Sequence, residues 1–282
     1  MSARPRTGSA ATLELTTAAS RAGRVPEALR HAVVLTQRHL RTFGRTPVVL
    51  VMNLVQPMMW LLLFGSLFRG VVALDGFPDD SFLEFLTPGI VMMMTLFASA
   101  WAGTVFVQDI DRGVLDRFLA SPTSRGALMV ASLAFQSVLA VVQTLVVLAV
   151  AWLAGARFDG GPAGVALLLL GVVLLTTALS SVSNAIALLA GTQEAMLGVS
   201  QLLNTPLLFV SSAIMTTSAS APWVADVARF NPFEWAVVVG RQALAADRDA
   251  GLLWGHVALL AGLAVALTWL ATLAFRARQR SA

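Results

Sequence analysis

The sequence predicts an all-α, polytopic membrane protein. Of its 282 residues, 57% are apolar and only 12% are charged. The apolar residues fall into runs of about twenty or more, and a helix rising about 1.5 Å per residue needs that length to cross a hydrocarbon core about 30 Å thick. We expect six transmembrane helices, an N-terminal interfacial amphipathic helix, and an outer re-entrant helical hairpin between the fifth and sixth transmembrane helices.

The N-terminal part divides into a tail and an amphipathic helix. Residues 1–25 are rich in Ala, Ser, Thr, Gly and Arg without a helical or strand period, which predicts a disordered cytoplasmic tail. From Pro26 onward, apolar residues recur every three or four positions while arginines occupy other positions on the helix. Residues 26–45 are therefore predicted to lie along the cytoplasmic membrane interface, and residues 46–282 to form the transmembrane domain.

Six apolar segments are predicted to cross the membrane, and they cover about residues 48–68, 86–107, 126–154, 162–190, 196–216 and 252–275. The stretch 217–251 is too apolar for an ordinary loop and too interrupted for a full crossing, which predicts the re-entrant hairpin. Within it, Asn231 is expected to cap a helix that begins at Pro232, with Glu234 near the positive end of that helix.

The arginine distribution predicts the orientation. If the N-terminus is cytoplasmic, eight arginines of residues 1–46, three of the loop after the second span and three at the C-terminus lie inside, against five outside. Because cytoplasmic segments carry the excess of basic residues, both termini are predicted to be cytoplasmic. We expect the protein in the cell (plasma) membrane.

Several function classes are disfavoured by the residues present. All 19 basic residues are arginine, so the phosphate-binding Gly-x-x-x-x-Gly-Lys-Ser/Thr loop is missing and any ATPase must be a separate chain. The chain has no cysteine, and its histidines, His31, His39 and His256, are far apart in the sequence, which argues against a metal site. No Gly-x-Ser-x-Gly elbow is present. The arginines lie mostly beside spans, so the basic pI indicates topology rather than nucleic-acid binding.

A compact charged stretch, Asp109–Arg125, lies between the second and third predicted spans. On a helix, one face would be apolar and another charged, the first made by Ile110, Val114, Leu115 and Phe118 and the second by Asp109, Arg112 and Asp116. Such a helix could dock into a groove on a soluble partner. On these residues alone, a solvated loop whose charges set the topology explains the stretch equally well.

Several motifs in order resemble the type-2 class of ABC exporter permeases (the ABC-2 family), and most closely its daunorubicin-resistance (DrrB-like) branch. They are Gln56-Pro57, Phe85-Leu-Thr-Pro-Gly-Ile90, the stretch from Asp111 to Arg125, and Asn231-Pro-Phe-Glu-Trp-Ala-Val-Val-Val-Gly-Arg241. The resemblance covers about residues 26–280. The sequence departs from it at Gln108, where many relatives carry an acidic residue, and at Glu234 and Trp235, which replace small or hydroxylated residues.

The resemblance implies a permease subunit that works as a dimer, with a second copy or a paralogue, and is driven by a separate cytoplasmic ABC ATPase. ATP and Mg would bind to that ATPase, so this chain would hold no cofactor, no metal and no catalytic residue. The coupling helix would comprise Asp109, Ile110, Arg112, Gly113, Val114, Leu115, Asp116, Arg117 and Phe118. Nucleotide-driven closure would move spans one, two and five to give alternating access to a central path.

Polar, aromatic and methionine side chains of these three spans are the candidates for the substrate path: Asn53, Gln56, Trp60, Met92, Phe97, Trp101, Asn204, Phe209 and Met215. Flexible methionines and flat aromatics suit an amphipathic cargo, but lipid-facing or core packing explains each aromatic or methionine as well, and helix-to-helix hydrogen bonds explain the asparagines and the glutamine. Glu234 and Arg241, about two turns apart, are the candidate outer gate, although pairing with neighbours or water also accounts for them.

The predicted function is export of a drug, antibiotic or other amphipathic secondary metabolite. Export of a lipid or polysaccharide by the same fold is the nearest alternative. A membrane-embedded enzyme or a sensor subunit without transport is a different class, and the missing nucleophile and metal arrangements disfavour the enzyme.

Overall fold

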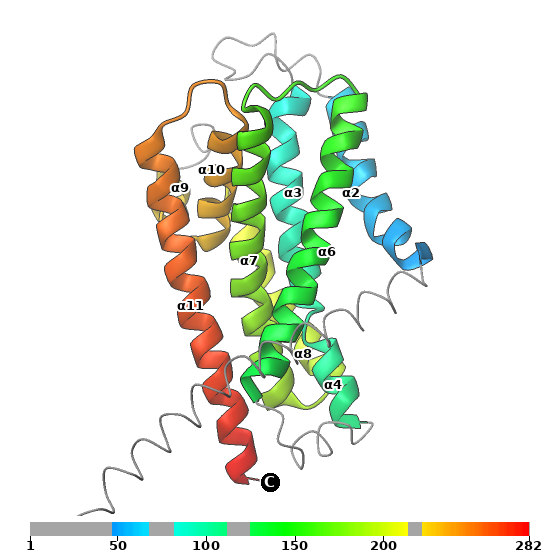
Figure 1. Ribbon diagram of the computed structural model, residues 1–282, viewed down its shortest axis with the longest axis vertical. Helices are drawn as coiled ribbons and strands as arrows, with labels where there is room; N and C mark the ends of the chain where they lie inside the picture. The colour runs from blue at the N-terminus through cyan, green and yellow to red at the C-terminus, as the bar shows by residue number, and fades with distance from the viewer. Residues whose placement is uncertain (1–46, 68–81, 112–124, 214–221, 282) are drawn as a thin grey trace, which may run out of the picture.

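The computed structural model describes residues 47–67, 82–111, 125–213 and 222–281, which form a bundle of α-helices (Figure 1). Within these ranges the chain consists of helices and their connections, without strands. The predicted tail (1–25) and interfacial helix (26–45) lie outside the described residues.

Nine helices follow one another in the described chain. They are α2 (Pro47–Leu67), α3 (Phe82–Ala100), α4 (Thr104–Asp111), α6 (Arg125–Leu153), α7 (Gly161–Ala190), α8 (Gln193–Phe209), α9 (Pro222–Ala228), α10 (Pro232–Leu244) and α11 (Ala250–Ser281). The helices α6 and α7 match the third and fourth predicted spans closely, because turn-forming residues separate two long apolar runs. At the end of α7, Gly191 adopts a left-handed φ of 72° and its N–H donates to the carbonyl of Ala187.

Four segments of the described chain are long and apolar enough to cross a membrane, namely Phe82–Gln108, Met129–Leu153, Gly161–Ala190 and Ala250–Ala274. A fifth apolar segment, Leu54–Leu67, is shorter. The helix α8, with 17 residues, lies below the length of a full crossing at about 1.5 Å per residue. The all-helical, multi-pass architecture is therefore confirmed, whereas the count of six spans stays a prediction.

The bundle has two distinct ends, which we name after the short helices found there. Figure 1 shows α4 and the C-terminus of α11 at one end, the α4 end. At the opposite end, the α10 end, lie α10 and the connection between α6 and α7. The bundle thus keeps the end of α4 and the C-terminus on one side, as the predicted topology requires.

The helix α7 is the centre of the packing. It contacts α3, α6, α8, α10 and α11, and its residues Leu168, Val172 and Leu175 are fully buried. Small residues let α10 approach it closely: a Cβ added at Gly171 would lie 2.9 Å from a methyl group of Val239. The helix α10 is therefore a fixed part of this core.

The second predicted span is divided, which corrects the expectation of one continuous helix over 86–107. The helix α3 ends at Ala100, a turn follows, and α4 begins at Thr104. At this turn the backbone N–H of Gly103 donates to Ser183 Oγ (3.1 Å), and the Ser183 hydroxyl donates to the carbonyl of Ala100 (2.8 Å). The serine of α7 therefore satisfies backbone groups that the interruption leaves without helical partners.

The fifth predicted span is shorter than the expected Met196–Thr216. The helix α8 begins at Gln193 after the N-cap Thr192, and it ends at Phe209. Residues 211–213 form a bend, and we call residues 210–213 the α8 bend. The apolar segment Ala250–Ala274 matches the sixth predicted span, and the helix α11 continues beyond it to Ser281.

Asn231 joins the end of α8 to the start of α10. Its Oδ1 accepts a hydrogen bond from the N–H of Phe233 (2.9 Å), which confirms the predicted N-cap ahead of Pro232. Its Nδ2 donates to the carbonyls of Leu207 (2.7 Å) and Val210 (2.5 Å). One amide side chain thus satisfies both the first turn of α10 and the last turn of α8.

Replacing Gly103 with alanine is expected to destabilise the protein by about 1–3 kcal/mol, the usual cost of overpacking a close contact. The added Cβ would lie 2.5 Å from the carbonyl oxygen of Ser183 and 2.5 Å from Met196 Sδ. The matched control is Gly198→Ala in α8, where a Cβ meets no atom within 4 Å. The free energy of unfolding, measured by SDS titration of the detergent-solubilised chain, checks this; equal values for both variants would contradict the close approach.

Asn231→Asp is expected to destabilise the protein by about 2 kcal/mol or more, although aspartate caps helices as well as asparagine does. The carboxylate keeps the acceptor for the N–H of Phe233 but loses both donors and faces the carbonyls of Leu207 and Val210. The same SDS titration measures the free energy of unfolding of this variant. If the Asn231→Asp variant is as stable as the parent chain, capping alone matters at this position.

Candidate functional site

A polar cluster connects the α8 bend to α10 near the α10 end of the bundle. Glu234 and Arg241 extend from the first and last turns of α10, and Ser212 lies in the bend. The two charges are seven positions apart, which places them about 10 Å apart along the helix axis but on the same side of it. The structure therefore brings the two predicted gate residues together at one serine.

Ser212 is hydrogen-bonded to both charged side chains. Its N–H donates to Glu234 Oε2 (2.6 Å), and its hydroxyl donates to Glu234 Oε1 (2.7 Å). The guanidinium of Arg241 donates through Nη1 to Ser212 Oγ (2.9 Å) and through Nη2 to the carbonyl of Ser212. Hydrogen bonds that involve an ionised partner are about twice as strong as neutral ones, so this is a strong connection.

The electrostatic setting favours both charges where they are. Glu234 is 9% exposed and lies in the first turn of α10, where the helix dipole favours an anion. Arg241 lies in the last turn, where the dipole favours a cation, and its guanidinium carbon lies 4.0 Å from the ring centroid of Phe85 in α3. Buried charges are costly unless they are hydrogen-bonded, and Ser212 gives both charges hydrogen-bond partners.

The helix α3 touches the α8 bend through a glycine. A Cβ added at Gly89 would collide with the carbonyl oxygen of Ala213 and lie 2.9 Å from its carbonyl carbon. Only a residue without a side chain allows the two backbones to come this close. The bend is thus held on one side by α10 and on the other by α3.

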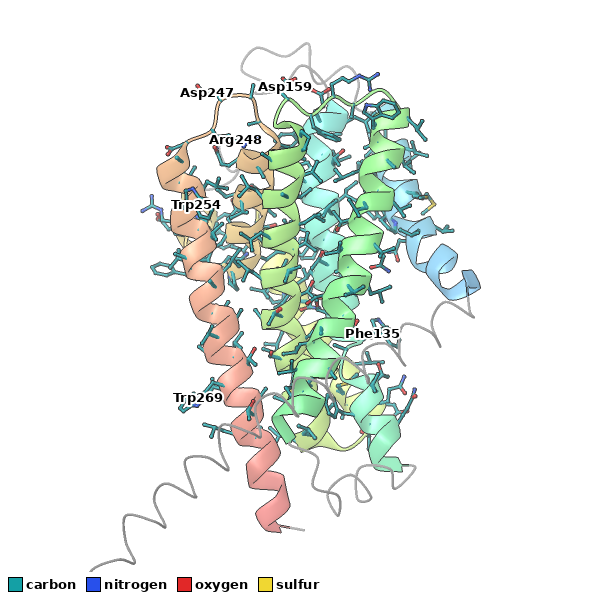
Figure 2. All side chains as sticks on the ribbon, in the orientation of Figure 1. Phe135, Asp159, Asp247, Arg248, Trp254 and Trp269 are labelled. Carbon is teal, nitrogen blue, oxygen red and sulfur yellow. The ribbon has the colours of Figure 1, made fainter. Side chains whose placement is uncertain are left out.

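Further polar contacts close the α10 end. The carbonyl of Gly160 accepts from Arg248, and the N–H of Gly160 donates to the carbonyl of Leu244 (3.0 Å). Glu84 Oε1 accepts from the N–H of Arg157 (2.7 Å), which ties α3 to the connection between α6 and α7. Figure 2 shows Arg248 at this end of the bundle, near the labelled Asp159 and Asp247. The contact at Leu244 fixes the C-terminal end of α10, and Asn231 fixes its start.

The predicted path residues fall into three groups. Met92 and Asn204 are buried, and Asn204 Nδ2 donates to the carbonyl of Leu96 (3.2 Å), so it makes a helix-to-helix hydrogen bond. Trp60 and Phe97 are partly buried against the core, and Trp60 stacks on Phe64 with ring centroids 4.7 Å apart.

The remaining path candidates are exposed or outside the description. Gln56 is exposed, as are Trp101 and Phe209, which are 55% and 78% exposed. Asn53 belongs to α2, but its side chain, like the whole of Met215, lies outside the described residues. Gln56, Trp101 and Phe209 therefore lie on the surface of the chain.

The predicted coupling stretch is described only at its beginning. Asp109 and Ile110 belong to the last turn of α4, while their side chains lie outside the described residues. The rest of the stretch also lies outside them: Arg112, Gly113, Val114, Leu115, Asp116, Arg117 and Phe118. Its role therefore stays a prediction from the sequence.

Ser212 is the cluster residue that the sequence interpretation did not single out, whereas Phe85 and Gly89 belong to a motif quoted there without a role in the site. Serine is common in membrane helices, and its contacts here are 22 and 29 residues away in the sequence. The available signal was the pair Ser211-Ser212, which interrupts the apolar run after Phe209. Across the ranges that the structure describes, no group of three His, Asp or Glu side chains is placed to hold a metal ion.

The chain is similar in sequence to known proteins. The chain is 29% identical over 237 residues to the daunorubicin resistance ABC transporter permease protein DrrB1 of Streptomyces coeruleorubidus, covering 82% of this chain and 83% of that one. It is 26% identical over 210 residues to ycf38, named as a putative transport permease, of Cyanophora paradoxa, with 74% and 72% covered. Residues 30–244 match the family described as ABC-2 type transporter. The chain, a multi-pass helical membrane protein, therefore belongs to the ABC-2 type transporter family.

Proposed function

We propose that this chain is the permease subunit of an ATP-driven exporter that carries a drug, antibiotic or similar amphipathic secondary metabolite. The observation that carries the proposal is its similarity, over 82% of its length, to a relative named for daunorubicin resistance. ABC-2 permeases are transport subunits, and the sequence contains no lysine for a phosphate-binding loop. ATP hydrolysis would therefore belong to a separate subunit.

In this proposal the ATPase acts on Asp109–Phe118, a stretch that begins in the last turn of α4. The contacts of α4 support a role in transmission, because the turn before it is bonded to Ser183 of α7. Met196 of α8 also packs against this turn, since its Sδ would lie 2.5 Å from a Cβ added at Gly103. A displacement of α4 would consequently reach α7 and α8 through direct packing.

We further propose six crossings with both termini in the cytoplasm of a cell membrane, and a dimer with a second copy or a paralogue. The α4 end would be the cytoplasmic end, and α9 with α10 would form the outer re-entrant hairpin. The exposed side chains of α2 and α8, among them Gln56 and Phe209, would then face the second subunit and the substrate path. Polar side chains such as Gln56 suit this setting better than lipid.

The cluster at Ser212 is the proposed outer gate. Glu234 and Arg241 are the two charged residues of α10, and both are hydrogen-bonded to the α8 bend. A rearrangement of α8 therefore requires these hydrogen bonds to be exchanged or to move with it. Charged groups inside a membrane domain are expensive and typically functional, which supports this role.

Val114→Asp together with Phe118→Asp is expected to abolish association with the ATPase, because charge would replace the apolar face that docks. The matched control is Val114→Ile with Phe118→Leu, which keeps that face apolar. Co-purification of the solubilised complex measures the association. If the aspartate variant retains its ATPase and its transport, the coupling assignment fails.

Co-expression of this chain with its ATPase in a drug-sensitive host is expected to raise resistance to amphipathic compounds. Glu234→Gln is expected to reduce that efflux about tenfold, since an amide has an acceptor at only one of the two oxygen positions that Ser212 bonds, and a hydrogen bond to a charged group is worth about 1.5 kcal/mol or more. Glu194→Gln, at an exposed acid of α8, is the matched control and should leave efflux unchanged. Intracellular drug accumulation is the measurement.

The same assay separates the cargo classes. Lowered accumulation of amphipathic drugs supports the proposal. Unchanged accumulation across compound classes, together with altered lipid or polysaccharide at the cell surface, would assign the exporter to the other cargo.

A further inference from the structure

All three polar groups of Ser212 are bonded to α10. Its N–H and hydroxyl donate to Glu234, and its hydroxyl and carbonyl oxygens accept from Arg241. We infer that Ser212 is the positioning residue of the outer cluster: it holds the carboxylate and the guanidinium in register and fastens the α8 bend to α10. The consequence for transport rests on the proposed function, whereas the positioning role itself does not.

The serine can position both charges because its own backbone is fixed independently of them. Asn231 Nδ2 bonds the carbonyl of Val210 on one side of it, and Ala213 lies against the backbone of Gly89 on the other. The donor and acceptor groups of Ser212 are thus directed before the two side chains arrive. Preorganised groups of this kind lose little freedom when the bonds form.

The hydroxyl is the only part of Ser212 that touches both charges. The N–H reaches Glu234 alone and the carbonyl reaches Arg241 alone, while Oγ lies 2.7 Å from Glu234 Oε1 and 2.9 Å from Arg241 Nη1. An alanine at this position would leave two separate contacts without the group that joins them. A threonine would keep the joining hydroxyl.

The accessibility of a buried residue of α10 reports whether the hydrogen bonds of the cluster are formed. Val237 lies three residues after Glu234 and four before Arg241, on the side of α10 that carries both, and it is 0% exposed. Because the parent chain has no cysteine, a single Val237→Cys reporter has no background. Cysteine is close to valine in size, so the substitution is mild.

The experiment measures the labelling rate of Val237→Cys by a membrane-impermeant maleimide in the full chain, with Ser212, Ser212→Ala or Ser212→Thr. Loss of a hydrogen bond to charged groups shifts an opening equilibrium by roughly tenfold to a hundredfold, so Ser212→Ala is expected to be labelled faster by that factor. Ser212→Thr is expected to stay within about twofold of the parent, because it retains the same hydroxyl.

The neighbouring serine supplies the matched control. Ser211 Oγ donates to the carbonyl of Leu208 (2.7 Å) and accepts from the N–H of Ala213 (3.4 Å), so its contacts stay within its own segment and none reaches α10. Ser211→Ala is therefore expected to leave labelling unchanged. Equal labelling in Ser212→Ala and Ser211→Ala overturns the inference. The thermal unfolding midpoint of each variant is recorded, and faster labelling with an unchanged midpoint distinguishes local opening from global unfolding.

A transport measurement completes the test. In the complex with its ATPase, Ser212→Ala is expected to lower the amount of drug exported per ATP hydrolysed, because an outer cluster that opens too readily allows ATP to be hydrolysed without export. Ser212→Thr is expected to keep the ratio of the parent chain. An unchanged ratio in Ser212→Ala overturns the positioning role in transport. The labelling needs neither cargo nor ATP, so failure of the parent complex to export drugs would refute the proposed function and leave the labelling result standing.

Discussion

A helix that ends inside a packed helix bundle leaves buried backbone groups without helical partners, and this constraint governs the structure around α8 and α10. Each such carbonyl or N–H that stays unsatisfied costs several kcal/mol by the general estimate of about 2–7 kcal/mol for burying an amide without a partner. Here Asn231, Glu234 and Arg241 satisfy the backbone groups of Leu207, Val210 and Ser212. The position of α10, its packing on α7 and the close approach of α3 all agree with that requirement.

A similar solution appears at the interruption between α3 and α4. There the side chain is Ser183, which belongs to α7, and the group it protects includes the N–H of Gly103. In both places a polar side chain of a neighbouring helix takes over the role of the missing helical turn. Both joints involve α8, because Met196 packs beside Gly103 and the α8 bend carries Ser212. The helix is therefore anchored at both of its ends, while much of the surface between them, including Leu202, is exposed.

The features that the sequence predicted were those with local signals. Turn residues separated α6 from α7, and the pair Asn231-Pro232 marked the start of α10. The interruption at residues 101–103 was missed because Trp101 and Ala102 continue the apolar pattern, so only the contact with Ser183 distinguishes it. Likewise, Glu234 and Arg241 could be chosen as rare charges in an apolar segment, but their shared partner lies more than twenty residues earlier. In helices that are apolar on all sides, periodicity does not tell which face is inside, so the burial of Met92 and the exposure of Phe209 followed only from the packing.

The side chains that connect α8 to α10 come almost entirely from one of the two helices. Those of Asn231, Glu234 and Arg241 come from α10 and its cap, whereas α8 and its bend contribute backbone carbonyls and N–H groups and a single hydroxyl. Backbone groups are present whatever the sequence of α8. The exposed residues of that helix can thus vary without weakening the hydrogen bonds that hold α8 to α10.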